Sequence, residues 1–114
     1  MSKAYDRDRL VELFGDDFRT LAEVEREFLD TARAAEREIG GTDDLAAVAR
    51  IAHRLKGASA MIGATALGQV AEGIEKAAGA ADRPGVRRLH GALSEEVRRV
   101  AQQTSAEQSV AVRA

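Results

Sequence analysis

One histidine in this sequence has neighbours that favour chemistry at its imidazole. His53 lies in the run IAHRLKGASAMIGA (residues 51–64), and Lys56 follows it by three residues. Residues three apart on a helix share a face, so the lysine ammonium can reach the surface around the ring. A neutral imidazole has a nucleophilic nitrogen lone pair, and a neighbouring ammonium can stabilise the oxygens of a phosphoryl group. The spacing therefore makes this pair a candidate site of phosphoryl transfer.

The helix surface around His53 is predicted to be low and flat. A helical wheel places the ring on the solvent-facing half, and its neighbours there are Ala46, Ala49, Arg50, Lys56, Gly57 and Ala60. Such a surface normally carries long polar side chains, and a glycine inside a helix costs about 1 kcal/mol relative to alanine. We expect another protein's backbone to approach the imidazole closely at this surface. Each of these residues taken alone also has an explanation that involves no function: His53 and Lys56 as solvated side chains, and Gly57 as a packing glycine.

The elements that must position these residues are predicted to be helices. The chain has 114 residues, the size of one domain, with 45% hydrophobic residues, 4% aromatic residues and one proline. Glycines and capping residues delimit helices over residues 6–14, 16–39, 42–62, 65 to about 79, and from 84 onward. Four substantial amphipathic helices with short turns predict an all-α, antiparallel up-down-up-down four-helix bundle with a short additional N-terminal helix. Glu25 interrupts the apolar stripe of the second of these helices.

The bundle is predicted to span residues 1–104, and the polar tail of residues 105–114 is expected to fray. The net charge of −2 with interspersed signs argues against nucleic acid or an anionic membrane as the main partner. No cysteine and only two histidines are present, so we predict no metal site. The charged N-terminus and short apolar runs favour a cytoplasmic protein.

The segment from Ala52 to Gly63 closely resembles the signature of histidine-containing phosphotransfer (HPt) domains. That signature reads A-H-x-L-K-G-x-S/A-x-x-I/L-G, followed by a leucine and later by an apolar residue paired with Glu or Gln. The matching positions are Ala52, His53, Leu55, Lys56, Gly57, Ser59, Ile62, Gly63, Leu67, Ile74 and Glu75. Outside residues 48–75 the resemblance rests on the helix pattern, which extends over about residues 6–104.

The resemblance implies a phosphocarrier that takes a phosphoryl group from one receiver domain and passes it to another in a multistep phosphorelay. His53 would be the phosphoacceptor, Lys56 would lie near the phosphoryl oxygens, and Gly57 would make room for the receiver. Glu75 would orient the imidazole, and a hairpin turning near residues 63–64 would set it level with His53. An ordinary surface carboxylate paired with a lysine or arginine is the alternative for Glu75.

Further expectations follow for the partners of such a carrier. Receiver domains of response regulators or hybrid histidine kinases would bind the His53 face, with apolar help from Leu10, Val11 and Phe14. The chain would need no cofactor, because Mg²⁺ belongs to the receiver, and it would have no ATP-dependent kinase activity of its own. The starting methionine and the whole bundle favour a free-standing carrier, and the resemblance implies a monomer.

Two other functions are weighed against the carrier. The phosphoacceptor element of a sensor kinase typically has an acidic residue after its histidine and a later proline, whereas Arg54 follows His53 here and there is no proline until Pro84. A non-phosphorylated helical adaptor that binds signalling partners is the remaining alternative. Such adaptors usually lose the histidine or the lysine, and both are present in this sequence.

Overall fold

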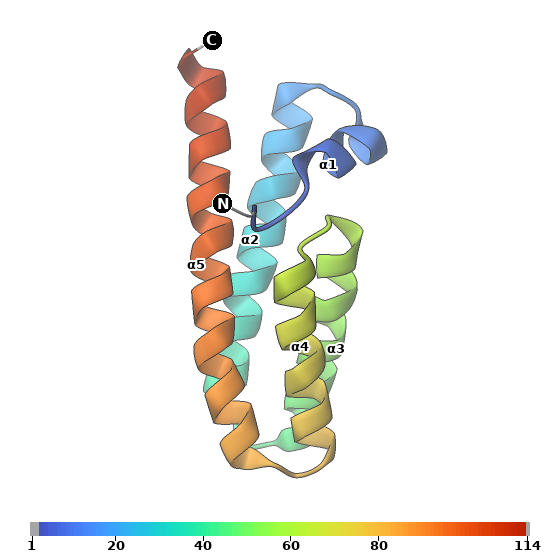
Figure 1. The fold of residues 1–114 in the computed structure, drawn as a ribbon, viewed down its shortest axis with the longest axis vertical. Coiled ribbons are helices and arrows are strands. Elements are labelled where there is room, and N and C mark those ends of the chain that lie inside the picture. The colour runs from blue at the N-terminus through green and yellow to red at the C-terminus, as the bar shows by residue number, and fades with distance from the viewer. Residues whose placement is uncertain (1–2, 114) are drawn as a thin grey trace.

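The described part of the chain, residues 3–113, is helical with no strand in this computed structural model (side chains are described to residue 109). The helices are α1 (Arg7–Phe14), α2 (Phe18–Gly40), α3 (Leu45–Met61), α4 (Thr65–Gly79) and α5 (Arg83–Arg113). Figure 1 shows α2 to α5 side by side, with each helix reversing the direction of the one before it. The predicted all-α fold with a short N-terminal helix is therefore confirmed.

Aspartate side chains begin three of the helices. Asp6, Asp17 and Asp44 accept hydrogen bonds from backbone N–H groups in the first turns of α1, α2 and α3. These bonds satisfy donors that have no partner inside the helix. The third helix accordingly begins at Leu45 and not at residue 42, because Asp44 is the residue that caps it.

The core lies between the four long helices and consists of aliphatic side chains and alanines. α3 packs against α2 and α4, and α5 packs against α2 and α4, so the four helices enclose one core. Its fully buried larger members include Leu10, Leu55, Leu67, Ile74, Leu93, Val48 and Val100. Small residues on α3 and α4 allow close packing there, which fixes the hairpin that carries the candidate site.

Glu25 is buried in this core because it has a polar partner from the N-terminal segment. The Tyr5 hydroxyl donates a hydrogen bond to the Glu25 carboxylate and lies 3.1 Å from the Thr104 hydroxyl. The Arg7 guanidinium lies 3.8 Å from the same carboxylate. A buried carboxylate is tolerated when it is hydrogen-bonded and paired in this way. Glu25 thus interrupts the apolar stripe of α2 because its carboxylate makes a tertiary contact with the N-terminal segment.

The expectation of a frayed tail differs from the structure, in which α5 continues as a helix through residues 105–113. Gln103 accepts hydrogen bonds from the Ala4 and Tyr5 N–H groups, at 2.7 and 3.1 Å. One turn further on, Glu107 forms an ion pair with Arg7 at 2.7 Å. The N-terminal segment therefore contacts α5 as far as Glu107, and residue 114 lies outside the described residues.

α1 lies across the end of the bundle where the α3–α4 hairpin turns (Figure 1). The Asp6 N–H donates to the Ile62 carbonyl at 3.0 Å, and Arg9 Nε donates to the Met61 carbonyl at 2.9 Å. These bonds pair carbonyls at the end of α3 that the helix itself leaves open. These bonds fix α1 beside the end of α3, which is the helix that carries His53.

Candidate functional site

The α3–α4 hairpin depends on a tight turn at Gly63. This residue has a φ of +70°, which glycine adopts without strain. A Cβ atom there would also lie 2.8 Å from the Asp6 Cβ, so α1 leaves no room for a side chain. The turn returns the chain so that α4 runs antiparallel to α3 along its length. Residues of α3 therefore face particular residues of α4.

His53 lies on the exposed face of α3 with one ring nitrogen engaged. Its Nδ1 atom is 2.9 Å from Glu75 Oε2, and the histidine side chain is 70% exposed. Because a carboxylate accepts, Nδ1 carries the proton, and in the neutral ring the other nitrogen, Nε2, has the lone pair. Among residues 3–109, whose side chains are described, none forms a hydrogen bond with Nε2. The structure thus brings His53 and Glu75 together as expected, and the bond to Glu75 uses Nδ1 and leaves Nε2 available.

Lys56 lies one turn further along the same face and has a carboxylate partner of its own. Its Nζ atom is 3.7 Å from Glu72 Oε1, and Lys76 Nζ approaches the same oxygen at 3.4 Å. Sequence reasoning missed Glu72. The signal that could have found it is its position three residues before Glu75, because Lys56 lies three residues after His53 and the helices are antiparallel.

The surface around the imidazole is low. Gly57 is exposed, and a Cβ built on it would meet nothing within 4 Å. Ala46 and Ala60 are also exposed, Ala49 is half-buried, and Arg50 is exposed. A shallow open hollow is lined by Ala49, Arg50, His53, Arg54 and Glu75. The predicted small residues therefore do lie around the ring, and their role in partner binding stays a prediction.

Exposed apolar side chains lie near the end of α3. Val11 and Phe14 of α1 and Met61 of α3 are each more than a third exposed. Phe14 and Met61 also line an apolar hollow of about 240 Å³ between α1, α2 and α3. Leu10 was expected on this surface, but it is fully buried, because it faces the core while Val11 faces outward.

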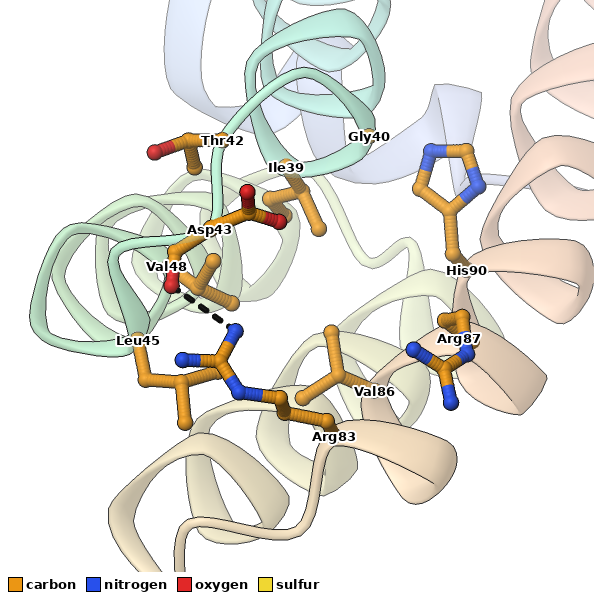
Figure 2. A pocket seen from close by; sticks show the side chains of 10 residues that line it. All are labelled: Ile39, Gly40, Thr42, Asp43, Leu45, Val48, Arg83, Val86, Arg87 and His90. Carbon is orange, nitrogen blue, oxygen red and sulfur yellow. Dashed lines mark hydrogen bonds between the residues drawn. The ribbon is translucent and has the colours of Figure 1, made fainter.

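His90 has a different environment at the opposite end of the bundle. Its Nε2 atom donates to the Glu36 carbonyl at 2.8 Å, and the residue is half-buried. It lines an open hollow of about 400 Å³ between the α2–α3 connection and the start of α5. Figure 2 shows the side chains that line this hollow. Arg83, which also lines the hollow, donates to the Asp43 carbonyl at 2.9 Å. His90 thus joins α5 to α2, and Arg83 joins the start of α5 to the α2–α3 connection.

Within the described residues, no group of three or more His, Asp or Glu side chains is arranged to hold a metal ion. None of the described helices is long and apolar enough to cross a membrane. The polar groups that the structure places on this face are the His53 imidazole, the Lys56 ammonium and the carboxylates of Glu72 and Glu75.

Comparison with known proteins gives the fold and the family of this chain. A solved rice structure, named as a histidine-containing phosphotransfer protein, has the same fold with a TM-score of 0.77. It is 19% identical, and the match covers 94% of this chain and 84% of the rice chain. No curated protein matches the sequence significantly. The family model of the Hpt domain matches residues 9–103, which is most of the chain and includes every residue of the hairpin site. The protein therefore belongs to the Hpt domain family.

Proposed function

We propose that this Hpt protein is a phosphocarrier whose His53 accepts a phosphoryl group from a receiver-domain phosphoaspartate and passes it to another receiver. Membership of the family supports a phosphotransfer role in two-component signalling. The observation that carries the residue assignment is the state of the two ring nitrogens. Nδ1 is held by Glu75 at 2.9 Å, while Nε2 is exposed. A histidine held in this way is prepared to act as a nucleophile.

The transfer step balances with the groups present. The Nε2 lone pair attacks the phosphorus of the aspartyl phosphate, the N–P bond forms, and the P–O bond to the aspartate breaks. The aspartate leaves as a carboxylate with the bonding electron pair. Glu75 stabilises the positive charge that develops on the ring through the proton on Nδ1. Passing the phosphoryl group on reverses these bonds with a second receiver, and Mg²⁺ would be supplied by that receiver.

The surrounding surface suits a protein partner. The exposed face at Ala46, Gly57 and Ala60 allows the receiver backbone to approach the ring. Arg50 can meet acidic groups at the rim of the receiver, which affects the association rate more than the affinity. We propose that Val11, Phe14 and Met61 add apolar contact area next to this face. The carrier would work as a cytoplasmic monomer, without nucleic acid or membrane and without kinase activity of its own.

The test is phosphoryl transfer from a phosphorylated receiver to the wild type, His53→Gln and His90→Gln. We expect acid-labile, base-stable label on the wild type and on His90→Gln, and none on His53→Gln. Equal labelling of the wild type and His53→Gln would overturn the assignment. Receiver binding without labelling of the wild type would favour the alternative, a helical adaptor that is not phosphorylated.

A further inference from the structure

Two polar pairs bridge α3 and α4 at successive turns. His53 faces Glu75 with 2.9 Å between the nearest atoms, and Lys56 faces Glu72 at 3.7 Å. The two residues of α3 are three apart, as are the two glutamates of α4. Each of the two chemically important side chains on α3 thus has its own carboxylate on α4. The proposed function gives a role to Glu75 and none to Glu72.

Glu72 is shared between two cations. Lys76, four residues later on the same helix, approaches Glu72 Oε1 at 3.4 Å, closer than Lys56 does. The three side chains are partly exposed, at 43% for Lys56, 41% for Glu72 and 76% for Lys76. Exposed ion pairs of this kind contribute little to folding and exchange partners readily. Lys56 can therefore leave Glu72 without leaving that carboxylate unpaired, because Lys76 remains.

A phosphoryl group on His53 would compete with Glu72 for this lysine. Such a group brings up to two negative charges within reach of Lys56, against one on the carboxylate. The Lys56–Glu72 ion pair must open before Lys56 contacts the phosphoryl oxygens, and this cost makes the phosphohistidine less stable than it would be beside an unpaired lysine.

We propose that Glu72 is a positioning residue that holds Lys56 in the unphosphorylated protein and weakens the interaction of Lys56 with the phosphoryl group on His53. This inference rests on the proposed function. Glu72 acts through Lys56, and Lys76 keeps Glu72 paired when Lys56 moves to the phosphoryl oxygens. The consequence is a phosphohistidine of limited stability, which suits a carrier that must release the group to a second receiver.

The experiment measures the equilibrium between phosphohistidine and the receiver's phosphoaspartate for the wild type and Glu72→Gln. We expect the variant to shift this ratio toward phosphohistidine by about threefold to tenfold, with the melting temperature nearly unchanged. In a Lys56→Met background the same substitution should change the ratio by less than about twofold. The matched control is Glu95→Gln, because Glu95 is an exposed carboxylate on α5 that pairs with Arg98 at 2.8 Å.

Labelling with phosphoramidate, a small phosphodonor, separates the two proposals. If His53 of the wild type is labelled and Glu72→Gln leaves the ratio unchanged, the role of Glu72 is wrong and the carrier function stands. An effect of Glu72→Gln that persists in full without Lys56 likewise overturns the inference, because the carboxylate would then act directly. If neither phosphoramidate nor a receiver labels His53, the proposed function fails and this inference fails with it.

Discussion

The two histidines of this protein are both on helices and both bonded through one ring nitrogen, yet they differ in what surrounds them. His53 is bonded to a carboxylate across a helix pair and has a 70% exposed side chain. His90 donates to the Glu36 carbonyl and is half-buried on the wall of an open hollow (Figure 2). A Cβ on Gly40 would lie 2.9 Å from its Nε2 atom, so backbone closely approaches this ring.

The difference indicates what would distinguish a reactive histidine, the role that we propose for His53, from a structural one. A carboxylate partner can stabilise a positive ring, whereas a neutral carbonyl does so less. A low, open surface admits a partner's backbone, whereas a packed wall does not. Both histidines are followed closely by a glycine that has open space around it, at Gly57 and Gly91. The glycines can therefore be used to test whether the surface around each ring matters.

The largest effect should come from filling the space beside His53. Glutamine at Gly57 has room, since a Cβ there meets nothing within 4 Å, and it is a better helix former than glycine. Its side chain would nevertheless stand where we propose that the receiver docks. We expect Gly57→Gln to reduce transfer from a receiver by about thirtyfold or more, the effect of losing a central interface contact. Labelling by phosphoramidate should change little.

The matched control is Gly91→Gln, next to His90, where a Cβ also meets nothing within 4 Å. This variant should accept the phosphoryl group from the receiver at the wild-type rate. Equal loss in both variants would show that the flat surface around His53 has no special role in docking. Transfer rates at limiting receiver concentration measure the difference.

The second prediction concerns stability, for which the glycine against the His90 ring, Gly40, should matter more than Gly57 beside His53. Gly40→Ala places a methyl group against the His90 ring and disturbs its hydrogen bond to the Glu36 carbonyl, which is 2.8 Å long. We expect a loss of about 1–2 kcal/mol in the free energy of unfolding, with His53 labelling retained. Gly57→Ala, which meets open space, should instead gain up to about 1 kcal/mol from helix propensity. Urea denaturation of both variants checks this, and equal signs would contradict the distinction.

Sequence reasoning predicted those parts of the site that follow from local pattern. The hairpin turn near Gly63 fixes which residues of α3 and α4 are level, so the approach of Glu75 to His53 could be foreseen. Glu72 was missed because a glutamate beside a lysine on a helix surface is ordinary. Its position matters only once side chains of two helices are placed together. Roles that depend on a partner's charge stay predictions until transfer is measured.

The N-terminal segment was the least predictable part of the fold. Its contacts join residues about one hundred positions apart, such as Arg7 and Glu107. Local composition makes residues 105–114 look like a polar tail, and the tertiary contact at Glu107 is not visible in that composition. Glu25 was similarly visible as an exception in an apolar stripe, but its partner Tyr5 lies outside any helix. No helical period can reveal such a pair.

The smallest expected effect concerns the buried carboxylate of Glu25, which contrasts with the partly exposed Glu75. Burial raises the pKa of Glu25 above its ordinary value, although the Tyr5 hydroxyl and the Arg7 guanidinium oppose the shift. Between the unfolded and folded pKa values the folded state binds more protons, so this group makes the protein less stable as the pH rises through that window. Its unfavourable contribution is fully present above the folded pKa and absent below the unfolded one.

We therefore expect Glu25→Gln, which keeps an acceptor for Tyr5, to change how stability depends on pH. The free energy of unfolding of the variant relative to wild type should be most favourable at pH 7 and should decline toward pH 4.5, the ordinary value for a glutamate. Urea denaturation at several pH values measures this difference. Glu95→Gln should run parallel to the wild type, because that side chain is exposed. Parallel curves for Glu25→Gln as well would contradict the prediction. They would mean that the interactions with Tyr5 and Arg7 fully offset the free-energy cost of burying the carboxylate, so that its pKa is not raised.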